Sequence, residues 1–338
     1  MHDSIASIAR AVLYEGYILW PYHRSALKNQ QRWTFGGVYP EAYSRAGHAD
    51  DACVMRTECV IATTGRFDLT VTVRFLHVVD RRIAELADGE EHFVDATTVR
   101  GTRHVAWQEA TEREIVVRAT QVDPTRVTRA DARLAIEPGK AREPLAEADG
   151  HVAAVIVRDW KDIEGSVIVT IVPVADGASR VGVTIRNTSR WDGGPRPDAQ
   201  RRALIGTHIV LHASGAEFAS EVDPPPALRE PVGDCVNVGS WPVLVGKEPD
   251  RHTMLASPII LYDYPSVAPE SSGDFFDAAE IDQLLVLSVL SMTDEEQARM
   301  RETDPRAREI LDRCRSMSAD EMLRLHGVTR ELRVVEAP

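Results

Sequence analysis

Apolar and polar residues alternate along the middle of the chain. Residues 67–79 alternate in this way, with Phe67, Leu69, Val71, Val73, Phe75 and Val79 on one face and polar or charged residues such as Asp68 and Arg74 on the other. A period of two predicts a strand with one buried and one solvated face, which is typical of antiparallel sheets. Related patterns predict further strands over 53–61, 103–107, 114–119, 151–158, 166–174, 180–187, 203–213, 216–222, 235–238, 243–245 and 258–263.

The predicted strands are short, and turn residues rather than helices separate many of them. Examples are Asp176-Gly177 and Ser214-Gly215. This arrangement predicts a sandwich or barrel instead of a doubly wound sheet. Two stretches interrupt the pattern. Residues 80–100 are rich in Ala, Asp and Glu and predict one short helix over 81–88. The polar stretch 122–150 predicts an insertion, either with a helix around 128–135 or as a loop.

Both ends of the chain have helical periodicity. Residues 4–13 place apolar side chains at helical spacing behind Ser4, a suitable N-cap. Residues 274–327 contain an apolar helical stripe and the capping boxes that begin at Thr293 and Ser318. We therefore expect a mainly β (α+β) protein. We expect its fold to be a distorted antiparallel β-sandwich with an N-terminal helix and a C-terminal helical subdomain.

The predicted domain organisation follows from these patterns. Residues 1–44 carry the N-terminal helix and an aromatic and basic segment, which we expect to pack on the sheet. Residues 45–265 form the β-rich domain with its polar insertion around 122–150. Residues 274–330 form the helical tail, and the sequence leaves the order of residues 122–150 open.

Composition narrows the class of protein. The chain has 338 residues, of which 43% are hydrophobic, and a formal net charge of −13. Such usage is ordinary for a globular protein, and the negative charge argues against a nucleic-acid partner, since phosphate binding needs a basic surface. The sequence shows neither a signal peptide nor an apolar run that could span a membrane, so we expect a cytoplasmic protein. The 4 cysteines lack a CxxC spacing and are expected to be free thiols.

The segment from Trp20 to Phe35 differs from the rest of the chain. It interleaves aromatic residues with four basic ones and contains no acidic residue. Such a mixture suits recognition of an anion or of an acidic protein surface, and Trp and Arg are enriched at the centres of interfaces. The competing interpretation is that the aromatic residues pack on the sheet while the cations pair with local carboxylates. The candidate binding residues are Trp20, Tyr22, Arg24, Lys28, Asn29, Arg32 and Trp33.

No catalytic, metal-binding or cofactor-binding motif emerges from the sequence. His208 and His212 are expected to share one face of a strand about 13 Å apart, which is too far for two ligands of one ion. Cys235 with His252 as its base is a weak candidate for a nucleophilic pair, because their spacing does not require it. We therefore predict no catalytic residue, no metal and no cofactor, although many active sites assemble from residues that are distant in sequence.

Two stretches carry a family resemblance. The first runs from Tyr14-Glu-Gly-Tyr17 to Phe35-Gly-Gly37, and the second contains Met292-Thr-Asp-Glu-Glu296 followed by Thr303-Asp-Pro-Arg-Ala307. Together they resemble uncharacterised accessory proteins encoded with nickel–iron hydrogenase gene clusters, over about a third of the chain. The resemblance implies a role in assembly, maturation or subunit handling of a metalloenzyme. It carries over no catalytic residue and does not imply that this chain holds nickel or iron.

These observations favour a non-catalytic cytoplasmic accessory protein that binds another protein, such as a hydrogenase subunit or maturation factor. Two alternatives stay open. One is a hydrolase-like enzyme that acts on an anionic small molecule in a pocket between the sheet and the N-terminal segment. The other is a structural subunit of a larger complex. The sequence determines neither the partner nor the oligomeric state, and it leaves open an ion bound only by residues that the fold brings together.

Overall fold

The computed structural model describes residues 36–87 and 89–265, together with single positions between 293 and 316. The range 36–265 lies within one compact unit, and the single positions lie within a second. The predicted N-terminal helix, the candidate residues between Trp20 and Trp33, and almost all of the predicted helical tail lie outside the described residues. These three expectations stay predictions.

Five antiparallel strands form the first sheet. Their order is β13 (Glu217–Phe218), β1 (Val54–Ala62), β11 (Ala178–Asn187), β10 (Ile163–Ala175) and β7 (Thr128–Ile136). β10 and β11 approach closely at Gly165, where a Cβ atom would lie 2.2 Å from the carbonyl oxygen of Arg186. Only glycine therefore fits at this position, where the backbones of the two paired strands come so close.

The second sheet is organised around β2 (Phe67–Ala87), a strand of 21 residues. One edge of β2 pairs with β12 and then with β9, and the opposite edge pairs with β6 and then with β3. The remaining strands continue the sheet outward from β12 and β9. The bounds are β12 (Ile205–Ser214), β9 (Val152–Trp160), β6 (Trp107–Val122), β3 (Glu90–Val94), β15 (Thr253–Ser257), β14 (Trp241–Leu244) and β8 (Gly139–Ala146).

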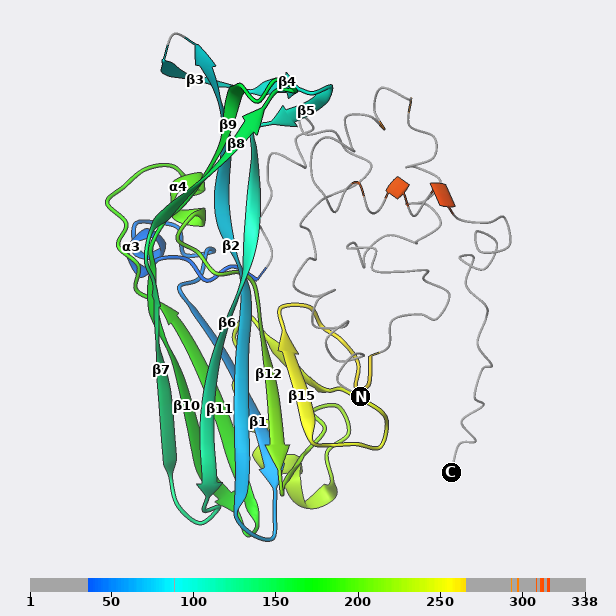
Figure 1. The fold of residues 1–338 in the computed structure, drawn as a ribbon. Helices are drawn as coiled ribbons and strands as arrows, with labels where there is room; N and C mark the ends of the chain where they lie inside the picture. The colour runs from blue at the N-terminus through cyan, green and yellow to red at the C-terminus, as the bar shows by residue number, and fades with distance from the viewer. Residues whose placement is uncertain are drawn as a thin grey trace. The chain divides into compact units, whose positions relative to one another are not determined.

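The main hydrophobic core lies between the two sheets. Alternate residues of β2, from Phe67 to Phe75, meet alternate residues of β10 and β11, such as Val169 and Val183, and all of them are buried. In Figure 1 the upper half of β2 continues past the first sheet together with β8 and β9. A separate hairpin of β4 (Ala96–Val99) and β5 (Thr102–Val105) lies in this extension. The structure thus confirms the predicted mainly β, antiparallel fold.

Two predicted helices are wrong. Residues 81–88 do not form a helix, because β2 runs to Ala87, and residues 128–135 lie in β7. Both segments are rich in Ala and Arg, which favour helices locally. Main-chain pairing with β9 and β3 in the first case, and with β10 in the second, overrides this preference. The polar stretch 122–150 therefore supplies β7 to one sheet and β8 to the other.

Short helices lie at both ends of the first sheet (Figure 1), and an ion pair fixes one of them. They are α3 (Glu41–Arg45), α4 (Arg196–Gln200), the 3-10 turn η1 (Pro226–Leu228) and α5 (Arg229–Gly233). From α4, Arg196 donates hydrogen bonds of 2.8 and 2.9 Å to both carboxylate oxygens of Asp51 and one of 2.6 Å to the Tyr39 hydroxyl. This bidentate contact fixes α4 against the loop after α3.

A buried amide links three separate segments beside these helices. The Nδ2 atom of Asn187 donates to the carbonyl oxygens of Val38 and Arg202 at 2.8 and 2.7 Å, and its Oδ1 atom accepts from the N–H of Ser189 at 2.9 Å. Asn187 is fully buried, so its side chain satisfies main-chain groups that water cannot reach.

No helix among the described residues is long and apolar enough to cross a membrane.

Candidate functional site

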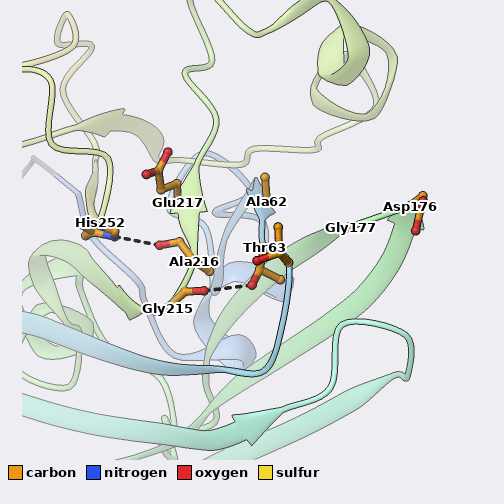
Figure 2. Close-up of a pocket in the computed structure, with 9 residues that line it drawn as sticks. Ala62, Thr63, Asp176, Gly177, Gly215, Ala216, Glu217 and His252 are labelled. Atoms are coloured by element: carbon orange, nitrogen blue, oxygen red, sulfur yellow. Dashed lines mark hydrogen bonds between the residues drawn. The ribbon is translucent and has the colours of Figure 1, made fainter.

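A groove of about 490 Å³ lies where several turns of the sandwich meet. The turn after β1, the turn between β10 and β11, the turn between β12 and β13, and the residue before β15 supply its lining (Figure 2). The lining residues are Ala62, Thr63, Thr64, Asp176, Gly177, Gly215, Ala216, Glu217 and His252. Turns at the end of a sandwich are a common place for binding residues, because the sheets hold them rigidly.

Thr63 fastens three of these turns together. Its hydroxyl group lies 2.9 Å from the carbonyl oxygen of Gly215, and its main-chain N–H donates to the carbonyl oxygen of Gly177 at 2.8 Å. The N–H of Gly65 donates to the same hydroxyl at 3.1 Å. These contacts hold the Thr63 side chain in one orientation in the lining of the groove.

His252 has a defined orientation. Its Nδ1 atom lies 2.9 Å from the carbonyl oxygen of Ala216, and its main-chain N–H donates to Asp250 at 2.9 Å. A carbonyl oxygen only accepts hydrogen bonds, so Nδ1 carries the proton and neutral His252 keeps the lone pair on Nε2. The lone pair could accept a hydrogen bond from a ligand in the groove.

The groove has an acidic lining. The carboxylates of Glu217 and Asp176 are exposed, and no lysine or arginine lines the groove. Figure 2 shows Glu217 and His252 toward one side and Asp176 toward the other. This chemistry suits a cationic or hydrogen-bond-donating group of a ligand, and it does not suit an anion. No serine or cysteine lines the groove either, so its described residues do not offer the usual nucleophiles of a hydrolase.

A second titratable cluster lies beside β1. Burial, and then the charges of Asp263 and Glu58, raise the pKa of Glu221 to about 8, and its Oε1 atom is buried with no hydrogen-bond partner among the described residues. Burial and the charge of Glu221 raise the pKa of the nearby Cys235 thiol to about 12, against the opposing effect of Arg180. A thiol with so high a pKa is almost entirely protonated at neutral pH and is a poor nucleophile.

The structure does not assemble the weakly predicted pair of Cys235 and His252. His252 lines the groove, and Cys235 does not. The Sγ atom of Cys235 lies 3.5 Å from the carbonyl oxygen of Pro231, while Nδ1 of His252 is engaged by the Ala216 carbonyl. Neither contact serves proton transfer between the two side chains.

The two histidines of β12 have different surroundings. His208 is fully buried and His212 is exposed. Burial, only partly opposed by a hydrogen bond to the Gly206 main chain, lowers the pKa of His208 to about 4. Nδ1 of His212 lies 3.0 Å from the hydroxyl oxygen of Thr253. Within residues 36–87 and 89–265, the structure arranges no three His, Cys, Asp or Glu side chains to hold a metal ion.

The sequence patterns did not identify the residues of the groove. Asp176, Gly177 and Gly215 stand out in the sequence only as turn residues, and Thr63, Glu217 and His252 show no motif. The signal that could have found them is their place at the ends of predicted strands. Their meeting depends on which strands are neighbours, which the sequence pattern does not determine.

Comparisons with known proteins do not define a family. No family model and no curated protein match the sequence. Among solved structures, the chain aligns with the secretin InvG of the Salmonella SPI-1 type III secretion injectisome in its open gate state. This alignment has 12% identity, covers 74% of this chain and 76% of that chain, and gives a TM-score of 0.17. So low a score carries no argument about fold or function.

Proposed function

We propose that this chain is a non-catalytic accessory protein that binds another protein, namely a subunit or maturation factor of a nickel–iron hydrogenase. The choice of partner is supported by the resemblance of Tyr14-Glu-Gly-Tyr17 and Met292-Thr-Asp-Glu-Glu296 to hydrogenase-associated accessory proteins. The acidic groove, which lacks a serine, a cysteine and a cationic lining residue, supports binding in preference to hydrolysis of an anionic molecule.

The observation that carries a binding role is an exposed apolar strip between α5 and β14, which we call the 236–241 strip. Val236, Val238 and Trp241 expose 49%, 46% and 40% of their surface, respectively. Between the two valines, Asn237 turns inward, and its Oδ1 atom accepts hydrogen bonds from Thr57 and from the N–H of Glu58. This inward anchor keeps both valine side chains at the surface.

Charged residues border the 236–241 strip. Arg56, whose main chain pairs with that of Val238, exposes 45% of its side chain, and Asp234 exposes 69%. An apolar centre with a charged rim is typical of protein interfaces. Clustered exposed apolar side chains in a protein of ordinary composition also favour a partner that covers them.

An affinity pull-down from the native cells tests the proposal, with mass spectrometry of the recovered proteins. The tagged native chain is compared with two variants. One carries Arg24→Ala, Arg32→Ala and Trp33→Ala in the predicted binding segment, and the other carries Val236→Ser and Val238→Ser. Val172→Ser is the matched control, because Val172 exposes 40% of its surface on β10, outside the strip.

The proposal is supported by two results together. The native chain and the control recover a hydrogenase subunit or maturation factor in stoichiometric amount, and at least one of the two variants remains folded but no longer recovers that protein. Recovery of no partner, or of the same proteins with every variant, contradicts it. The enzyme alternative then takes first place, and screening of small molecules against the folded chain is the next step.

A further inference from the structure

Among the described residues, β7 pairs along only one of its two edges. Its residues pair with β10 in one unbroken register from Thr128 to Ile136. Within residues 36–87 and 89–265, no strand pairs with the opposite edge of β7. A strand of nine residues without a bulge, and with neither proline nor lysine, presents a straight row of main-chain donors and acceptors.

Three other outer strands of the described sheets are short or interrupted. β13 has two residues, β8 contains Pro144 and a register shift, and β14 has four residues including Pro242. The far edge of β6 also has no strand partner among the described residues. On β6, Glu112 and Glu114 lie 3.1 and 3.8 Å from Arg74 of β2, and on β7, Arg133 lies 3.8 Å from Glu164 of β10. Short length, proline and register shifts are the usual devices that prevent edge pairing, and β7 has none of them.

The charges of β7 are complementary to those of a second β7. Arg129, Asp131 and Arg133 point to the solvent side of the sheet and are exposed. An antiparallel pair of β7 strands related by a two-fold axis at Ala132 places Asp131 of each copy directly opposite Arg133 of the other. Arg129 then lies opposite the small Ala135. Such a pairing makes two symmetry-related ion pairs on one face, and opposite charges in directly facing positions stabilise a sheet.

The inner face of β7 supports the same pairing. Ala130, Ala132 and Ile136 pack against the main core but are only partly buried. In the two-fold register, Ala132 faces Ala132 of the second copy and Ala130 faces Leu134. The small side chains leave room for the approach, and the second copy would cover apolar surface that the described chain leaves open.

We propose that β7 is the docking edge for a second copy of this chain, which joins the two five-stranded sheets into one antiparallel sheet. The inference is independent of the proposed function, because it involves neither the 236–241 strip nor the residues from Trp20 to Trp33. Pairing along one strand buries less surface than a stable dimer needs, so the dimer is expected to be weak, with micromolar affinity.

Analytical ultracentrifugation of the full chain over a concentration series up to about 100 µM tests this proposal. The native chain is expected to show a monomer–dimer equilibrium. Asp131→Arg places arginine opposite arginine at both symmetric positions and is expected to raise the dissociation constant at least about tenfold. The double variant Asp131→Arg with Arg133→Asp exchanges the charges, restores both pairs and is expected to dimerise as the native chain does.

Hydrogen exchange of the unmodified chain provides a second measurement that does not depend on the folding of a variant. Main-chain amides of 128–136 are expected to exchange more slowly at high than at low protein concentration. A chain that stays monomeric, a dimer that Asp131→Arg does not weaken, or a double variant that is folded but monomeric would each overturn the proposal. Concentration-independent exchange of the β7 amides would do the same.

Discussion

Replacing Glu221 by glutamine tests the electrostatics of the cluster beside β1. Burial and the carboxylates of Asp263 and Glu58 raise the pKa of Glu221 from 4.5 to about 8 in the folded chain. Between these two values the unfolded chain is ionised at this position, while the folded chain holds a proton. The contribution of Glu221 to stability is therefore fully present below pH 4.5, falls as the pH rises through this window, and is lost above pH 8.

The structure gives the size of this effect. The two pKa values differ by about 3.5 units, and each unit corresponds to about 1.4 kcal/mol, so full ionisation costs the folded state up to about 5 kcal/mol. Glutamine has nearly the same shape and no charge at any pH. The variant Glu221→Gln is expected to lose this contribution to the pH dependence, whatever constant change in packing the amide introduces.

Urea denaturation of the native chain and of Glu221→Gln at several pH values from 5 to 9 measures the difference directly. The free energy of unfolding of the variant, relative to the native chain, should increase steadily with pH up to about 8. Glu217→Gln is the control, because Glu217 is exposed and its replacement should leave the slope unchanged. Parallel curves for the native chain and Glu221→Gln would show that Glu221 is ionised in the folded state and would refute the reasoning.

Four further substitutions test the packing of the described residues. Asn187→Ala removes a donor to the carbonyl oxygens of Val38 and Arg202 and the acceptor of the Ser189 N–H. It should lower the free energy of unfolding by about 3 kcal/mol in urea titrations. Arg196→Lys loses the bidentate contact with Asp51 and should cost about 2 kcal/mol, seen as a lower Tm, because an ammonium group cannot reproduce two parallel hydrogen bonds. Gly165→Ala should cost about 2 kcal/mol through the clash with the neighbouring strand, again measured with urea, and an unchanged midpoint would contradict that close approach. His208 has a folded pKa of about 4, so the unfolded chain alone takes up its proton between pH 6.5 and 4. Acid should therefore remove up to about 3 kcal/mol of stability, and His208→Gln should flatten this limb of the pH profile.

Much of the β-sheet structure could be predicted from the sequence. The strict alternation from Phe67 to Phe75 predicted the core-facing half of β2, because a period of two puts successive side chains on opposite faces whatever the neighbouring strands are. The patterns of 166–174 and 180–187 likewise predicted most of β10 and β11. The antiparallel, mainly β class followed from these strands and from the short turns between them.

The pattern failed where small or charged residues carry the strand. In β7 the inward positions are Ala130, Ala132, Leu134 and Ile136, so the alternation is present but weak, and alanine and arginine suggested a helix. Residues 81–87, in the second half of β2, suggested a helix for the same reason. In both cases the free energy of pairing with neighbouring strands, which no local pattern contains, exceeds the helix preference of the individual residues.

The sequence by itself determined the class of fold, the acidic charge and the segment from Trp20 to Trp33 as the first candidate for binding. Tertiary structure alone decided that Thr63, Glu217 and His252 meet in one groove and that Asn237 turns inward beneath the 236–241 strip. It also decided that β7 is the last strand of its sheet in the part of the chain that the structure describes. Those relations join residues up to 189 positions apart. They depend on the order and register of strands, which long-range packing selects from many arrangements that satisfy the same local pattern.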